Sequence, residues 1–298
     1  MQVWPRKRAA RILPSVNWGA LSGSGLLGFL AYKVGMASIY AKDITEDSMM
    51  KTKKVVIPGT ILECPEMKIF SVRFYKNGKV IKDFIVGFDD ELKRKVKKIK
   101  ETKKIDDLKD FDDVRVIVYS DVKKTGVKKN PDIAEIGLGG GKDEKLNWIK
   151  EKIGKEISIE SVLKQGLVDV RGVSKGKGLQ GPVKRFGISL KQYKSEKGRR
   201  RPGSLAPWTP SRVTFRTAMA GQMGFHTRLT YNNLILKTGK PEEINKNEGF
   251  HKYGKIKTNY IILRGSVPGP KKRVLLLTKA LRESKKQSKK KFEILEIR

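Results

Sequence analysis

The chain has 298 residues, and its 66 Lys and Arg against 31 Asp and Glu give a net charge of +35. A charge of this size indicates a polyanionic partner, and nucleic acid is favoured over an anionic membrane because no spanning segment or strongly amphipathic helix is visible. One Cys and two His exclude an internal disulfide framework and a zinc site built from Cys and His.

The N-terminus is basic and has no acid before residue 43. A weakly apolar run at residues 19–31 follows, but Lys33 interrupts it before any small-residue cleavage pattern, so a signal peptide is not predicted. We expect residues 1–27 to form a basic extension and the protein to be cytoplasmic. The basic residues of this extension are Arg6, Lys7, Arg8 and Arg11.

Alternating and β-branched segments predict a mainly β fold. Asn77-Gly78 predicts a hairpin turn between two of the strands, and Gly-Pro clusters separate later ones. Many strands joined by short turns favour a closed antiparallel barrel, to which we assign residues 28–88 and 161–298. The strands are expected at residues 29–40, 53–62, 69–75, 80–86, 114–119, 167–173, 229–237, 260–265 and 273–278.

Residues 89–160 differ from the rest in charge, with nineteen basic and seventeen acidic residues. Apolar residues at helical spacing predict helices over 90–100 and 145–152, on either side of the strand at 114–119. Two helices and a strand predict a small α/β insert that interrupts the barrel.

The stretch from Arg171 to Arg228 holds fourteen Lys and Arg against one acid, Glu196. It is rich in Gly and Pro and has almost no helical or strand periodicity, so it cannot bury enough apolar surface to order itself alone. We expect a long finger at residues 174–224 that orders on an anionic partner. A basic tail at residues 279–291 is expected to behave in the same way.

Two glycine motifs resemble nucleotide-binding loops. Gly176-x-Gly178-x-x-Gly181 follows a strand, but residues 183–190 show no helical pattern and no acid lies near twenty residues onward, so a dinucleotide site is disfavoured. In Gly139-Gly140-Gly141-Lys142 the following residue is Asp143, where a phosphate-binding loop needs Ser or Thr, so a helix-entry loop is expected. No nucleophile with an adjacent base is visible, which disfavours catalysis.

Aromatic residues lie among the basic ones, and Trp208 stands between Pro207 and Pro210. It is either a plug for the end of the barrel or a rigid tip that enters folded RNA, where stacking on a base is worth about 1–3 kcal/mol. The other aromatic residues of this kind are Trp4, Trp18, Phe186, Tyr193, Phe215 and Phe225.

Five segments resemble one family. The resemblance is carried by Val168-Asp-Val-Arg-Gly-Val-Ser-Lys-Gly-Lys-Gly-Leu-Gln-Gly181 with Val183-Lys-Arg-Phe-Gly187, by Ala220-Gly-Gln-Met-Gly224, by residues 29–36 and by residues 264–269. Together they resemble the universal large-subunit ribosomal protein L three (L3) family, and they occur along the chain in the same order as in that family. The start of the chain and the tip around Trp208 are similar to the archaeal and eukaryotic branch.

The resemblance implies a six-stranded barrel of the translation-factor type, with the finger and N-terminal arm running through ribosomal RNA toward the peptidyl transferase centre. It implies a structural, non-catalytic component that supports early assembly of the large subunit. The implied partners are 23S-type rRNA and neighbouring proteins of the L fourteen and L twenty-four e types, with no membrane. No cofactor is implied beyond the magnesium that RNA can carry. Eukaryotic members commonly have His where this chain has Glu196, so the resemblance does not carry a role of that imidazole over to this chain.

From charge and resemblance together we expect RNA-binding residues in the arm, the finger and the adjoining strands. They are Arg6, Lys7, Arg8, Arg11, Lys33, Arg171, Lys175, Lys177, Lys184, Arg185, Arg199, Arg200, Arg201, Trp208, Arg212, Arg216, Gln222, His226 and Arg228. Two other classes of protein stay open on the sequence alone: an RNA-modifying enzyme that docks through the barrel, and a factor that visits the ribosome transiently.

Overall fold

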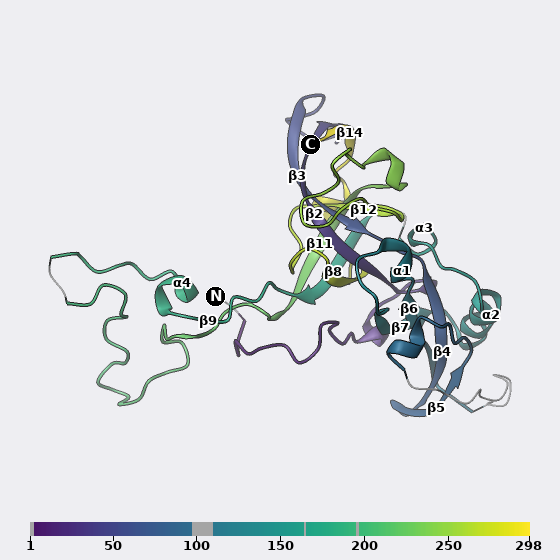
Figure 1. Ribbon diagram of the computed structural model, residues 1–298, viewed down its shortest axis with the longest axis horizontal. Coiled ribbons are helices and arrows are strands. Elements are labelled where there is room, and N and C mark those ends of the chain that lie inside the picture. Colours follow the sequence, from purple (N-terminus) through teal and green to yellow (C-terminus); the bar gives the residue numbers. More distant parts are fainter. Residues whose placement is uncertain (1–2, 97–109, 164, 195–196) are drawn as a thin grey trace. The chain divides into compact units, whose positions relative to one another are not determined.

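The computed structural model describes residues 3–96, 110–163, 165–194 and 197–298 (Figure 1). It divides into a finger unit, Met1–Ile12 with Val173–Arg228, and a core unit, Leu13–Gly172 with Leu229–Arg298. Every buried apolar side chain among the described residues belongs to the core unit, except Val173. Burying one such side chain stabilises a fold by about 1.5–3 kcal/mol, so hydrophobic burial organises the core unit.

Six strands of the main sheet form a closed ring of pairings. Strand β13 pairs with both β8 and β2, so that Leu276 lies opposite Arg171 on one side and Leu30 on the other. Strand β14, Phe292–Ile297, pairs with the C-terminal end of β2, at residues 39–43, beyond the residues 28–32 that pair with β13. The ring strands are β2 Gly28–Asp43, β3 Lys54–Glu63, β8 Leu167–Val173, β11 Thr227–Gly239, β12 Tyr260–Arg264 and β13 Val274–Lys279.

A second, five-stranded sheet has the order β1-β7-β6-β4-β5. Asn77 and Gly78 both have positive φ, 51° and 72°, and they form the predicted hairpin turn between β4 and β5. We expected these two strands in the barrel, but β4 pairs with β6, because alternation along a strand does not specify its partner. The strands are β1 Gly25–Leu26, β4 Met67–Lys76, β5 Lys79–Ile85, β6 Asp113–Ser120 and β7 Ile133–Gly139.

All nine expected strands are present, with ends within three residues of those predicted. Three strands of the core unit were missed: β1, β7 and β14. Strand β7 contains two glycines, which weaken a strand pattern, and β14 directly follows the basic tail. The tail itself contains the short helix α5, Lys285–Ser288. Two further short strands, β9 Leu179–Gln180 and β10 Gly221–Gln222, pair with each other in the finger unit.

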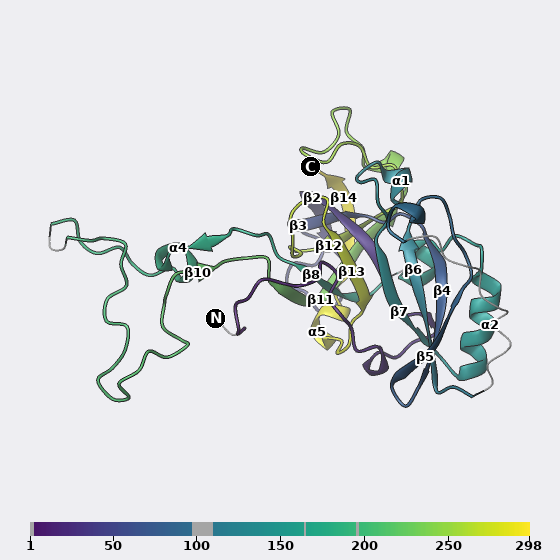
Figure 2. The same ribbon diagram turned by 60° about the horizontal axis from the view of Figure 1, so that its bottom comes forward.

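The predicted helix over 145–152 is confirmed as α2, Lys142–Lys152, which lies along the five-stranded sheet with Ile149 fully buried (Figure 2). The Gly141 amide donates to Glu144 Oε2 at 3.1 Å, so the preceding glycines form a helix-entry loop, as predicted. Of the predicted helix over 90–100, the structure shows the 3₁₀ turn η2, Leu92–Arg94, and residues 97–100 lie outside the described residues. The remaining elements are η1 Trp18–Ala20, α1 Val122–Thr125, α3 Ile159–Val162, α4 Pro182–Phe186 and η4 Pro241–Glu243.

One apolar cluster joins the two sheets of the core unit, with Leu30 and Leu277 from the ring and Val72 and Val116 from the second sheet. Trp18 is buried in this cluster, at 5% exposure, although the sequence analysis grouped it with the aromatic residues that lie among basic ones. A Cβ at Gly137 would lie 2.6 Å from the Trp18 Cβ, so only glycine leaves room for the indole. The second half of the N-terminal segment is therefore part of the core unit.

Candidate nucleic-acid interface

The finger begins where β8 leaves the ring, as a two-stranded stem. The Lys177 amide donates to Met223 O and the Met223 amide donates to Gly178 O, each at 2.9 Å, and the β9–β10 pair continues the ladder. At Gly224 φ is +72°, and a Cβ there would lie 2.0 Å from Lys175 O. Glycine is required at this position because only it permits both the left-handed backbone and the close approach.

The N-terminal arm lies against the base of this stem. The Ala9 amide donates to Phe225 O at 2.8 Å. His226 is 8% exposed; its Nε2 accepts from the Gly224 amide at 3.1 Å, so Nδ1 carries the proton and donates to Lys7 O at 2.9 Å. The His226 ring thus connects arm and finger, and its two nitrogens are already used within the chain.

The glycine-rich segment ends at a helix, contrary to our expectation. Helix α4 begins at Pro182, with Gly181 before it and Gly187 in the left-handed conformation after it. The sequence signal was the proline itself, which is favoured at the first position of a helix. Helix α4 has five residues and is too short to supply the helix dipole that a dinucleotide site uses. A dinucleotide site at this segment therefore remains disfavoured.

Beyond α4 the outgoing and returning segments of the finger separate into a wide loop, which has no regular secondary structure in its described part (Figure 1). Few hydrogen bonds stabilise this loop. In one pair the Lys191 amide donates to Arg199 O, and the Arg199 guanidinium donates to Lys191 O. Trp208 is 95% exposed, so it is not a plug packed into the described part of the chain. Glu196, the only acid of the finger unit, lies outside the described residues.

Of the nineteen expected RNA-binding residues, all but Lys33 and Arg171 lie in the finger unit. Lys33 Nζ donates to Val267 O at 2.7 Å and to Gly269 O at 3.1 Å, and burial lowers its pKa. Lys33 therefore stabilises the loop at residues 267–269, which follows β12. On β8, Arg171 Nε is buried and has no hydrogen-bond partner among the described residues.

Two other expected contacts are used partly inside the finger. Arg185 donates from Nε to Gln222 O at 3.1 Å and from Nη1 to Met219 O at 2.9 Å. Gln222 donates from Nε2 to Gly224 O at 2.9 Å. These side chains fix the return strand of the finger, which is a positioning role that sequence alone does not reveal.

Like charges crowd the finger unit. The pKa of Arg6 is lowered by desolvation and by the neighbouring guanidinium groups of Arg185 and Arg228. In its described part the finger unit has no acid to offset this repulsion. An anion placed among these groups would relieve it, which is the electrostatic property of a polyanion-binding surface.

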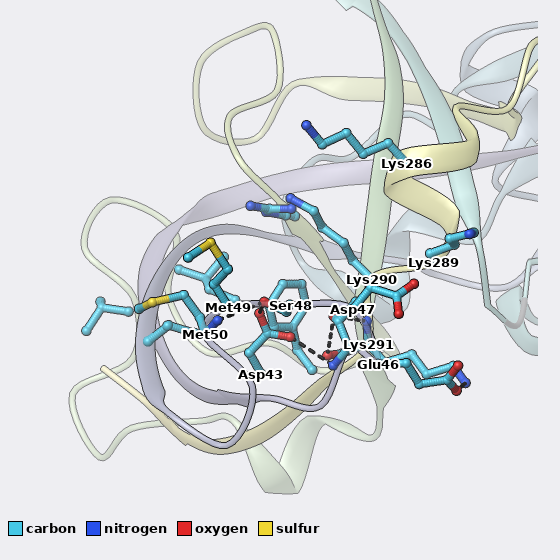
Figure 3. Close-up of a pocket in the computed structure, with 16 residues that line it drawn as sticks. Asp43, Glu46, Asp47, Ser48, Met49, Met50, Lys286, Lys289, Lys290 and Lys291 are labelled. Carbon is cyan, nitrogen blue, oxygen red and sulfur yellow. Dashed lines mark hydrogen bonds and ion pairs between the residues drawn. The ribbon is translucent and has the colours of Figure 1, made fainter.

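The core unit has a further pocket of about 810 Å³, between the β2–β3 turn and the tail, lined by both acidic and basic side chains (Figure 3). The Asp43 carboxylate accepts from the Thr45 amide at 2.9 Å and from Ser48 Oγ at 2.7 Å, which holds the turn. The side chains of Thr45 and then Ser48, together with that amide, lower the pKa of Asp43. Across the pocket lie four lysines of the basic tail. The tail was predicted from the sequence, but these lysines were not among the expected RNA-binding residues. They are Lys286, Lys289, Lys290 and Lys291.

The described residues contain neither a reactive thiolate nor a metal-binding cluster. Cys64 is buried, and burial raises the pKa of its thiol well above the usual range, so it is not a thiolate nucleophile. Within the described ranges no three His, Cys, Asp or Glu are placed to hold a metal ion. None of the described helices has the length and apolarity to cross a membrane.

These features define a class: a β-rich, strongly basic protein with a long unit whose charge is not neutralised within the described chain. The family model described as Ribosomal protein L3 matches residues 1–297. The chain therefore belongs to the ribosomal protein L3 family, and the resemblance seen in its sequence motifs is confirmed. As a ribosomal protein it is part of the translation ribonucleoprotein, in the cytoplasmic ribosome.

Among its relatives are archaeal proteins named large ribosomal subunit protein uL3. The one from Methanosphaera stadtmanae is 41% identical, over 95% of this chain and 90% of the relative. The Nanoarchaeum equitans protein is 39% identical, over 97% and 92%, and the Picrophilus torridus protein is 36% identical, over 100% and 93%. The similarity thus extends through the core unit and the finger unit.

Proposed function

We propose that this protein is a structural, non-catalytic component of the large ribosomal subunit that binds large-subunit rRNA directly. The observation that carries the proposal is the finger unit: it has seventeen Lys and Arg and one acid, and of its described residues only Val173 and His226 are buried. A segment with so little core needs RNA to order it, and neutralised phosphates with released counterions would supply the free energy.

The finger and arm are proposed to extend through rRNA toward the peptidyl transferase centre, with Trp208 at the tip, and to act early in subunit assembly. The 95% exposure of Trp208 and its separation from any described packing partner support this role. The proposed contacts are the basic residues of the finger unit named above. Lys33, Gln222 and His226 are proposed to shape the contact surface, because their polar atoms bind other parts of the chain.

We also propose that the ring of six strands is a barrel of the translation-factor type, within residues 28–88 and 161–298 but without β4 and β5, and that residues 89–160 are an insert. The insert would share its sheet with β4, which pairs with β6, and with β5, which pairs with β4. Neighbouring proteins of the L fourteen and L twenty-four e types are the proposed protein partners.

The test is sedimentation of the full chain with large subunits through high-salt sucrose. An integral component stays with the subunit, whereas a transient factor is released. In parallel, affinity for large-subunit rRNA should fall with salt, with a log-log slope of about 0.7–0.9 for each neutralised phosphate. Release of the chain together with a slope near zero would contradict the proposal.

A further inference from the structure

The finger unit contains an apolar pocket of about 500 Å³, formed where the arm meets the region around α4. Three aromatic rings form its walls. Trp4 meets Phe215 edge to face, with ring centroids 5.5 Å apart and planes at 86°, and it lies 6.2 Å from Phe186 at 28°. The volume falls within the range of about 300–1,000 Å³ found for small-ligand pockets.

The apolar walls remain open. Phe215 is 68% exposed and Met219 is 45% exposed. Exposed apolar rings in a cavity are unfavourable in water, and a flat ring system that enters the cavity would cover them. Because the two ring planes stand at 86°, a flat base can stack on only one of them, and Phe215 is the open one since the Arg6 guanidinium lies over the Trp4 ring.

Two guanidinium groups border the same pocket. The Arg6 Cζ lies 4.2 Å from the Phe186 centroid and 4.7 Å from the Trp4 centroid, and the Arg185 Cζ lies 5.1 Å from that of Phe186. The bonds from Arg185 Nε and Nη1 to the finger backbone hold its guanidinium in place. In the described residues its Nη2 has no partner and faces no acid, which leaves a donor for a phosphate oxygen.

We propose that this pocket binds one unpaired nucleotide of the large-subunit rRNA, with its base stacked on the exposed Phe215 ring beside Trp4 and its phosphate held by Arg6 and Arg185. Aromatic walls beside fixed guanidinium groups match a base attached to a phosphate, and such unstacked bases are the usual targets of RNA recognition by aromatic side chains. The inference rests on the proposed RNA-binding function and specifies one site within it.

The test uses large subunits that contain the full chain. Ultraviolet cross-linking followed by mass spectrometry should find a nucleotide attached to the peptide of Trp4 or Phe215. Chemical probing should then show that nucleotide at least threefold more reactive in subunits with Phe215→Leu, which keeps apolar volume but removes the ring. The matched control is Tyr193→Leu, an exposed aromatic of the same unit outside the pocket, which should leave that reactivity unchanged.

The outcomes separate this inference from the proposed function. If the chain is retained in subunits and other finger residues cross-link to RNA while Trp4 and Phe215 do not, the pocket inference fails and the proposed function stands. Attachment of these peptides to a neighbouring protein would also overturn the inference. If the chain is absent from subunits and no part of it cross-links to RNA, both fail. Loss of incorporation in Phe215→Leu alone leaves the wild-type cross-link as the deciding measurement.

Discussion

The core unit and the finger unit of one chain are stabilised by different physics. The core unit contains 49 basic and 30 acidic residues and closes two sheets over a common apolar cluster. The finger unit has seventeen basic residues and one acid, and it is held by a short ladder, a histidine bridge and contacts between rings and guanidinium groups. The difference teaches that this chain folds one part through hydrophobic burial and leaves the other for its partner to complete.

The largest change in stability is expected for Trp18→Ala, which tests hydrophobic burial in the core unit. Trp18 is 5% exposed within the shared cluster, and deleting a buried indole costs about 3–5 kcal/mol through lost burial and the cavity left behind. Urea unfolding of the full chain should show that loss in free energy. A loss below about 1 kcal/mol would mean that residues 13–21 do not belong to the core.

Tyr253→Phe probes a buried polar network of the core unit. The Glu63 carboxylate accepts from the Tyr253 hydroxyl and from the amides of Lys257 at 2.8 Å and Thr258 at 3.1 Å. Losing one donor to this buried group should cost about 1–3 kcal/mol at neutral pH. Retention of wild-type stability would show that water or another group replaces the hydroxyl.

The same variant should change the alkaline limit of stability. Burial and then the negative charge of Glu63 raise the pKa of Tyr253, so its contribution is complete below the unfolded value of about 10 and is lost as pH rises above it. Tyr253→Phe should reduce the slope of unfolding free energy against pH by up to about 1.4 kcal/mol per unit above pH 10. An unchanged slope in that range would assign the titration to other tyrosines.

A smaller, local effect is expected in the finger unit for His226→Ala. The variant leaves the Gly224 amide and Lys7 O without their partner, so the arm should open more often and the Ala9 amide should exchange its hydrogen about tenfold faster. Hydrogen exchange measured by NMR checks this. His251→Ala, at an exposed position of the core unit, is the control and should leave Ala9 unaffected. Equal effects of both variants would argue against the bridge.

The smallest effect on stability is expected for Trp208→Ala. Because Trp208 is 95% exposed, unfolding free energy should change by no more than about 0.5 kcal/mol. In assembled subunits, however, the chemical reactivity of RNA near the peptidyl transferase centre should change. A strong shift in unfolding with unchanged RNA reactivity would reverse the assignment and make Trp208 a core residue.

Local patterns predicted the strands well because side-chain alternation is a property of neighbouring residues. They did not show that β4 and β5 join the second sheet, because pairing partners are chosen through contacts between residues distant in sequence. The same limit applies to the site. Charge identified the finger, but only the fold shows that His226 and Gln222 bind the chain's own backbone and that Trp4 and Phe215 meet.

The sequence by itself determined the separation of charge along the chain, the β-rich class, the finger and the family. Those properties depend on composition, local periodicity and motifs, which are written in consecutive residues. Only the tertiary structure decided that Trp18 is core while Trp208 is exposed, and that Lys33 braces a loop. Burial and hydrogen-bond partners depend on where distant segments meet, and a residue's type does not specify that.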